Sequence, residues 1–68
     1  MLKSNIGTLL KNSKYNREYV QKYLGVSANT LSNWSTNRSI PSLEKAFKLA
    51  MLLDVKVDDL YMWIDDEK

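Results

Sequence analysis

Four helix boundaries that fall close together constrain the fold of this sequence more than any other feature. Asn16 is a good N-cap, because its side-chain oxygen can accept a hydrogen bond from a free amide of the first helical turn. Gly25 ends that helix by accepting a left-handed conformation, and Ser27 caps the next one. Asn37 closes the second helix, as one of the few non-glycine residues that tolerate a positive φ. The sequence therefore predicts two short helices joined by a tight turn that contains glycine.

The rest of the sequence also predicts helices, and no strands. No run alternates apolar and polar residues, and the β-branched residues are scattered. Apolar spacings of three and four residues predict five helices, over about 2–12, 17–24, 28–36, 43–53 and 57–64. In the fourth helix, one apolar stripe combines Leu43, Ala46, Phe47, Ala50 and Leu53. We therefore expect a single compact all-α domain over residues 1–68.

The composition argues against an enzyme. The 68 residues include no cysteine and no histidine, which removes disulfides, thiolate metal sites and imidazole bases. With two glycines in total, the sequence has no glycine-rich phosphate loop. We expect no enzyme activity, cofactor, metal or small-molecule ligand.

The longest apolar run, Leu60–Ile64, is too short to cross a bilayer, and the N-terminus carries no secretion signal. A cytoplasmic, nucleoid-associated protein is therefore expected.

Charge is distributed unevenly along the chain. The net charge is +2, yet residues 1–38 hold six Lys and Arg against one Glu, a balance of +5. Residues 39–68 hold four Lys against seven Asp and Glu, a balance of −3. A basic half suits a polyanionic partner, and the acidic half would face away from it. The pattern favours nucleic-acid binding, with chance clustering on a small surface as the alternative.

The helix expected over 28–36 carries an unusual surface for a solvated helix. No charged residue occurs from Val26 to Asn37, although 26% of the chain is charged. A face of short polar side chains can enter the major groove of DNA, where an asparagine amide can donate to and accept from the edge of adenine. The alternative is an ordinary solvated face. The predicted base contacts are Ala28, Asn29, Ser32 and Asn33.

Residues that flank this helix are suited to hold phosphates. Arg17 stands beside the free amides at the start of the helix over 17–24, which form an anion-binding corner. Taken singly, each flanking residue is more often a plain surface residue, so it is their grouping around one groove-sized element that favours contact. The predicted phosphate contacts are Lys14, Asn16, Arg17, Lys22, Thr36, Asn37, Arg38 and Ser39.

The stretch from Asn16 to Tyr61 resembles the lambda-repressor-like, or XRE/Cro, family of bacterial and phage regulators. The resemblance lies in Leu24-Gly25-Val26-Ser27, Thr30-Leu31-Ser32-Asn33-Trp34, Asn37-Arg38, Pro41-Ser42, Ala50 through Leu53, Val57-Asp58 and Leu60. It implies a five-helix DNA-binding domain whose third helix enters the major groove, and a dimeric transcriptional regulator, with repression the expected role. By position, Ala28, Asn29, Ser32 and Asn33 match the family's base-reading sites, and Arg17 matches its contact at the start of the second helix.

The sequence departs from the family pattern at two positions, and functions other than DNA binding must be weighed for the same fold. Gln21 stands where family members usually carry alanine, at the close approach of two helices, and Asn37 replaces a common glycine. A protein-interaction module, anti-repressor or antitoxin-like, could keep this fold without binding DNA. The modest net charge and the absence of Arg and Gln from 28–36 keep that alternative open beside DNA binding. RNA binding is less favoured, because no exposed aromatic is interleaved with the basic residues.

The apolar residues of the helix expected over 57–64 lead us to predict a homodimer. At about 100° per residue, one face of the helix over 57–64 can close the core through Val57, Leu60, Tyr61 and Ile64. A chain of 68 residues cannot wrap a helix that is apolar on all sides, which leaves Met62 and Trp63 uncovered. We therefore expect Met62 and Trp63 to form a two-fold interface that sets two recognition helices about 34 Å apart on double-stranded DNA.

Overall fold

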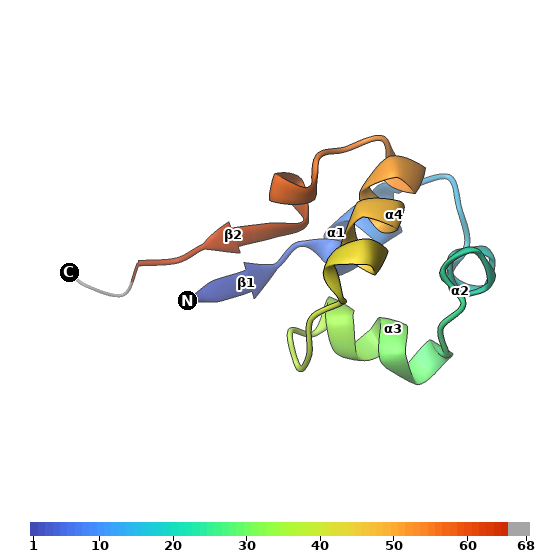
Figure 1. The fold of residues 1–68 in the computed structure, drawn as a ribbon, viewed down its shortest axis with the longest axis horizontal. Coiled ribbons are helices and arrows are strands. Elements are labelled where there is room, and N and C mark those ends of the chain that lie inside the picture. The colour runs from blue at the N-terminus through green and yellow to red at the C-terminus, as the bar shows by residue number, and fades with distance from the viewer. Residues whose placement is uncertain (66–68) are drawn as a thin grey trace.

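The structure, a computed structural model, describes residues 1–65. In this part of the chain, α-helices form the body and two short strands from opposite ends of the sequence pair as a ribbon (Figure 1). None of its helices is long and apolar enough to cross a membrane. In chain order the elements are β1 (Leu2–Ser4), α1 (Ile6–Asn12), α2 (Arg17–Leu24), α3 (Ala28–Ser35), α4 (Leu43–Leu53), the 3-10 helix η1 (Val57–Leu60) and β2 (Tyr61–Trp63).

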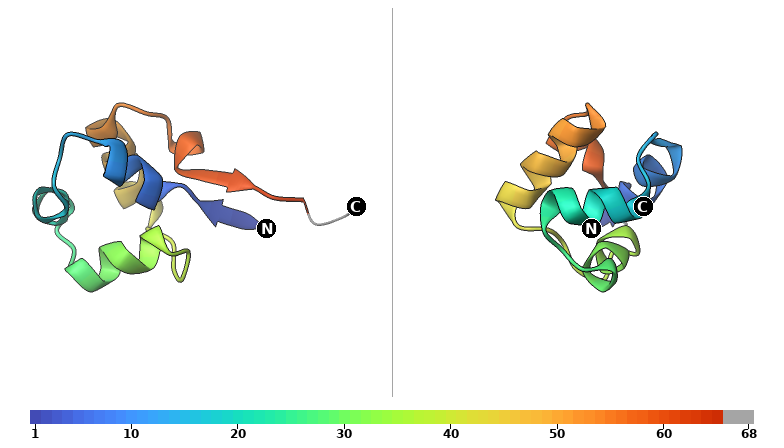
Figure 2. Two further views of the ribbon diagram at one scale, coloured as in Figure 1. Left: turned by 180° about the vertical axis from the view of Figure 1, so that it is seen from behind. Right: turned by 90° about the vertical axis from the view of Figure 1, so that its right-hand side faces the viewer.

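Every helical element contributes to one apolar core. Helices α1 and α4 lie on opposite sides of it, as the front and rear views show (Figures 1 and 2). The side chains with no exposed surface come one from each of α1, α2, α3, α4 and η1: Ile6, Val20, Leu31, Leu49 and Leu60. Trp34 is also buried, on the inward face of α3, as the sequence predicts. Among residues 1–65 no polar or charged residue belongs to this core.

The helix boundaries that the sequence predicts around the turn are confirmed. The Asn16 side chain accepts a hydrogen bond from Tyr19 N at 2.8 Å, and Ser27 Oγ accepts one from Thr30 N at 3.1 Å. Gly25 takes a left-handed conformation with φ of 69°, and Asn37 takes φ of 67°. These caps and stops work through local geometry, which is why they can be predicted from neighbouring residues alone.

The all-α helix-turn-helix fold is confirmed, but both ends of the expected five-helix pattern are corrected. The helix expected over 2–12 begins at Ile6, and η1 and β2 replace the helix expected over 57–64. Strands β1 and β2 pair antiparallel, with Lys3 opposite Met62. Tyrosine and tryptophan suit a strand, and the pairing partner lies almost a whole chain length away. Local periodicity carries no information about such a partner.

The ribbon presents different residues on its two faces. Residues directly opposite each other in an antiparallel pair point to the same side, and successive residues alternate. Leu2 and Trp63 therefore share one face, while Met62 points to the other. The helical arrangement that grouped Met62 with Trp63 is wrong, and one flat partner surface cannot cover both side chains.

The buried stripe of α4 is also rotated from the one expected. Ala46, Leu49 and Ala50 are buried, whereas Leu43 is 71% exposed and Phe47 is 53% exposed. Leu49 takes the inward position because α4 packs between α2 and η1, so the helix presents the face that meets both. Leu43 and Phe47 are left as apolar side chains without cover.

Candidate nucleic-acid interface

Helices α2 and α3 are fixed to each other by their turn and by α4. Val26 N donates to the Gln21 carbonyl at 3.0 Å, which closes the turn after Gly25. Lys45 Nζ, from α4, donates to the carbonyl of Leu24, the last residue of α2, at 2.9 Å. A lysine complements the free carbonyls and negative dipole at a helix C-terminus. The two axes cross steeply, because α2 is seen end-on where α3 runs across the view (Figure 1).

The predicted base-reading residues lie on the outward side of α3. Ala28, Asn29 and Ser32 are exposed and Asn33 is half-buried, while the opposite face of the helix is packed into the core. Residues four apart on a helix are neighbours, with Cβ atoms about 5–6 Å from each other. The side chains of Asn29 and Asn33 can therefore address adjacent bases along one groove.

The loop after α3 folds back onto the end of that helix. Arg38 N donates to the Asn33 carbonyl at 2.8 Å, and Ser39 N donates to the same carbonyl at 3.3 Å. The Thr36 hydroxyl bonds back to the preceding turn of the helix, because Oγ1 donates to the Ser32 carbonyl at 3.0 Å. Arg38 and Ser39 are both exposed. A cationic side chain therefore follows directly on the candidate base-reading face, as a phosphate contact requires.

A second cation reaches the same end of α3 from another element. Arg17, at the start of α2, donates from Nη2 to Ser35 Oγ at 3.2 Å while remaining exposed. Ser35 Oγ in turn donates to the Leu31 carbonyl at 3.0 Å. The Arg17 side chain, from the start of α2, thus reaches the last residue of α3, which precedes the loop that carries Arg38.

The other predicted phosphate contacts on and before α2 are placed less tightly. Lys14 is exposed, with its Nζ 5.5 Å from the centre of the Tyr15 ring. The side-chain oxygen of Asn16 is occupied as the cap of α2. Lys22 is exposed in the last turn of α2, away from the corner that Arg17 forms. None of these three side chains has a contact that orients it toward the outward face of α3.

Asn37 faces the ribbon. Its side-chain nitrogen donates to the Leu2 carbonyl at 2.9 Å, and its backbone amide reaches the Trp34 carbonyl at 3.4 Å. Ser4 also joins the ribbon to the end of α3, because its Oγ donates to the Trp34 carbonyl at 2.7 Å. Ser4, Ser35 and Lys45 are missed by reasoning from the sequence, since each bonds to a segment that no local pattern connects to it.

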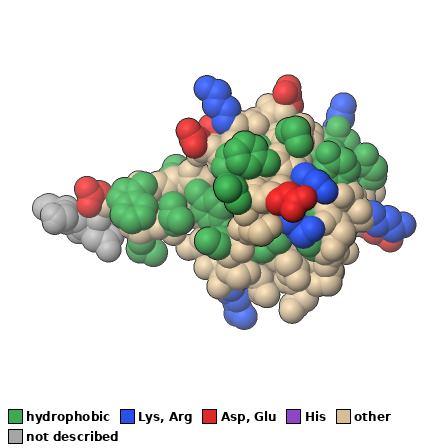
Figure 3. Space-filling model, in the orientation of Figure 1, with side chains coloured by type: hydrophobic (Ala, Val, Ile, Leu, Met, Phe, Trp, Pro, Cys, Tyr) green, Lys and Arg blue, Asp and Glu red, His purple; other side chains and the backbone are tan. Residues whose placement is uncertain are grey.

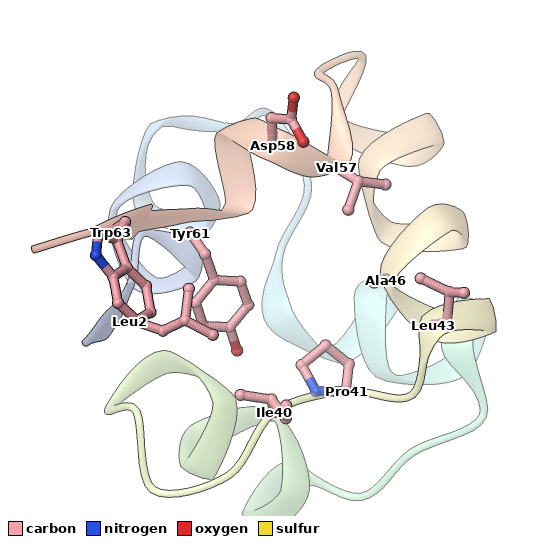
Figure 4. Close-up of a pocket in the computed structure, with 9 residues that line it drawn as sticks. All are labelled: Leu2, Ile40, Pro41, Leu43, Ala46, Val57, Asp58, Tyr61 and Trp63. Carbon is pink, nitrogen blue, oxygen red and sulfur yellow. The ribbon is translucent and has the colours of Figure 1, made fainter.

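An apolar face lies to one side of this region. A hollow of about 550 Å³ is lined by the ribbon, by the loop before α4, by the start of α4 and by η1. Its residues are Leu2, Ile40, Pro41, Leu43, Ala46, Val57, Asp58, Tyr61 and Trp63 (Figure 4). A second hollow, with Phe47 and Met51, adjoins it at Val57 and Asp58. Figure 3 shows hydrophobic side chains on the ribbon and on the surface beside it. We call these two hollows together the apolar face.

Tyr61 lines this face with an unpaired hydroxyl. The oxygen is shielded from solvent and has no hydrogen-bond partner among the described residues. Burial raises the pKa of Tyr61, and the neighbouring Ser4 hydroxyl opposes that shift in part. In residues 1–65 no three acidic side chains lie close enough together to hold a metal ion.

Two comparisons with known proteins match this arrangement. The helix-turn-helix family model matches residues 6–60, a stretch that includes all four α-helices and η1. An uncharacterized HTH-type transcriptional regulator of Methanocaldococcus jannaschii is 39% identical over 51 residues, which cover 75% of this chain and 77% of the relative. The similarity therefore spans the α2–turn–α3 unit and the helices that support it.

Proposed function

Since this chain belongs to the helix-turn-helix family of DNA-binding regulators, we propose that it reads specific sequences in double-stranded DNA and represses transcription. Helix α3 lies in the major groove, with Ala28, Asn29, Ser32 and Asn33 against base edges. Arg17, Arg38 and Ser39 hold phosphates beside the C-terminal end of α3. Repression follows from occupancy, because a bound protein denies its site to other proteins.

The observation that carries this proposal is the outward face of α3. It is exposed and free of charge, although charged residues make up 26% of the chain. Short amides and hydroxyls match the donors and acceptors of base edges, and they leave room for the helix to approach them. The cations lie beside this face, at the start of α2 and after α3, where the DNA backbone would pass.

Replacing the two asparagines tests the base-reading role. With a preferred duplex selected from random sequences, Asn29→Ala and Asn33→Ala should each weaken binding by about 1–3 kcal/mol, because each removes a contact to one base. Binding to a random duplex should hardly change. Fluorescence anisotropy at a fixed salt concentration gives both affinities.

The controls separate base contacts from phosphate contacts. Asn12→Ala makes the same change on an exposed residue of α1, and it should leave both affinities as they are. Arg17→Ala should weaken binding to both duplexes alike and reduce the salt dependence by about one unit per half-site. Equal losses on preferred and random DNA for both asparagine variants would refute the base-reading role.

We propose further that the protein binds DNA as a homodimer through the apolar face. Of the ten large apolar side chains exposed in residues 1–65, six line its two hollows: Leu2, Ile40, Leu43, Phe47, Met51 and Trp63. A stable interface buries about 800 Å² on each partner, which is about one-sixth of the 4810 Å² surface of this chain. A two-fold contact lets Trp63 of each copy enter the hollow of the other, so the same face supplies both halves of the contact.

A further inference from the structure

Two side-chain hydrogen bonds attach the ribbon to the end of α3. Ser4 Oγ donates to the Trp34 carbonyl at 2.7 Å, and Asn37 Nδ2 donates to the Leu2 carbonyl at 2.9 Å. Both bonds run between β1 and the last turn of α3 or the loop that follows it. They join segments 30 and 35 residues apart in the sequence. The C-terminal end of the candidate recognition helix is therefore held by the N-terminal strand.

The ribbon is a firm support for such an attachment. Its pairing continues beyond β1 and β2, because Ile64 N donates to the Met1 carbonyl at 2.7 Å and Asn5 N donates to the Leu60 carbonyl at 2.8 Å. Ile6 and Leu60, which follow β1 and precede β2, have no exposed surface. The ribbon is thus anchored in the core at one end, and it cannot shift without disturbing fully buried side chains.

The attached end of α3 is also the end that carries proposed DNA contacts. Asn33 lies one residue before Trp34, and its carbonyl accepts from Arg38 N and Ser39 N. Asn37 stands inside this same loop, in the left-handed conformation that turns the chain back. One small unit therefore contains a base-facing side chain, a phosphate-facing cation and the attachment to the ribbon.

We propose that Ser4 and Asn37 are positioning residues that set the orientation of the C-terminal end of α3 and so determine sequence specificity. This inference rests on the proposed function. Neither residue needs to touch DNA, since the Ser4 hydroxyl and one N–H of the Asn37 amide already donate within the protein. Asn37 therefore acts through Asn33 and Arg38, in place of the direct phosphate contact expected from the sequence.

The two kinds of DNA contact respond differently to a shift of α3. Bidentate base contacts from short side chains depend on placement within a fraction of an ångström. Long arginine and lysine side chains can follow a phosphate through the same shift. Loosening the attachment should therefore weaken binding to the preferred duplex and spare binding to random DNA. A direct phosphate contact would weaken both.

Asn37→Gly is the sharpest test, because glycine keeps the left-handed turn and removes only the amide that reaches Leu2. Ser4→Ala removes the second bond, together with the hydrogen bond that Ser4 Oγ accepts from Ile6 N at 3.2 Å. Affinity for the preferred duplex should fall by about 3- to 10-fold in each variant, with affinity for random DNA unchanged. In the free protein, hydrogen exchange of the Arg38 and Ser39 amides should become faster. Ser13→Ala removes hydroxyl bonds to the Leu10 and Tyr15 carbonyls, away from the ribbon, and should move neither measurement.

Three outcomes would overturn the inference. Equal weakening on preferred and random DNA for Asn37→Gly would make Asn37 a phosphate contact. Unchanged affinity for both duplexes in Asn37→Gly and Ser4→Ala would deny these residues any role in specificity. Unchanged exchange at Arg38 and Ser39 would show that the ribbon does not hold this loop, whether or not DNA binds. A wild-type protein that prefers no duplex would refute the proposed function itself, a failure that the exchange data on free protein distinguish from the failure of the attachment.

Discussion

At the scale of single residues, the Tyr61 hydroxyl is shielded from solvent without a hydrogen-bond partner in residues 1–65. Burial raises its pKa above the ordinary value of 10.0, so the folded state favours the neutral phenol more than the unfolded state does. The stability that depends on this neutral group is complete below pH 10, and it is lost as the pH rises through the higher pKa of the folded protein.

Tyr61→Phe should therefore remove part of the alkaline loss of stability. At about pH 8 the variant should be at least as stable as wild type, because deleting an unpaired shielded hydroxyl is neutral or favourable. Near pH 11 it should be the more stable of the two, and the advantage should grow as the pH rises. Urea unfolding at both pH values measures this difference. The other three tyrosines are present in both proteins, so the comparison isolates Tyr61. An identical pH dependence in the two proteins would contradict the account of Tyr61.

Single residues that act on their immediate neighbours could be predicted from the sequence. Asn16 and Ser27 as caps, and Gly25 and Asn37 at positive φ, all obey local backbone geometry. The amide of Asn37 could not be placed in this way, since its acceptor, Leu2, is remote in the sequence. The residues on the outward face of α3 were located from their pattern, and their contacts with bases stay a prediction.

At the scale of elements, the sequence predicts those that are stabilised locally and misses those that need a distant partner. Helices α2 and α4 occupy the ranges expected for them, because caps and apolar spacing define both. The segment Tyr61–Trp63 is helical by periodicity alone, yet it is extended because Leu2–Ser4 supplies its backbone partners. The exposed Leu43 and Phe47 show a related limit, since packing against neighbouring elements chooses which side of an apolar helix is buried.

The hydrogen bond from Lys45 links α4 to α2, and we expect its removal to lower the free energy of unfolding. Its Nζ donates to the Leu24 carbonyl at the end of α2, and Lys45→Met keeps the aliphatic stem while removing the donor. The variant should lose about 1–2 kcal/mol of unfolding free energy, because a partly buried carbonyl loses a charge-assisted bond. Lys48→Met, at an exposed position on the same helix, should lose less than about 0.5 kcal/mol. Chemical denaturation measures both, and equal losses would exclude a special role for Lys45.

At the scale of the whole molecule, the two proposed surfaces make different demands. The outward face of α3 is polar, with Arg17 and Arg38 beside it. The apolar face combines the ribbon with the exposed side of α4. Apolar surface of this kind on a small protein marks an interaction site. The division suits a regulator that binds DNA with one surface and a second copy of itself with another.

Two neighbouring residues of the ribbon, Trp63 and Met62, allow a matched test of the proposed dimer. Trp63 is 70% exposed and lines the larger hollow, while Met62 is 47% exposed on the opposite side of the ribbon. Trp63→Ser should shift the protein toward monomer by at least about tenfold in dissociation constant, because an aromatic anchor in a pocket dominates such contacts. Met62→Ser should leave the dimer intact. Sedimentation over a concentration series decides, and a wild type that stays monomeric both free and on a palindromic duplex would exclude the dimer.

The central claim is that α3 and its flanking loop form the DNA interface, and amide chemical shifts report this residue by residue. Titrating the labelled protein with its selected duplex should shift the amides of residues 28–39 and of Arg17, in proportion to the bound fraction. Amides of η1, whose main contacts are with α4 and β2, should shift little. Saturation with perturbations confined to these positions is the result that we expect. Perturbations centred on the apolar face, or none with any duplex, would contradict the claim and favour a protein-interaction module of the same fold.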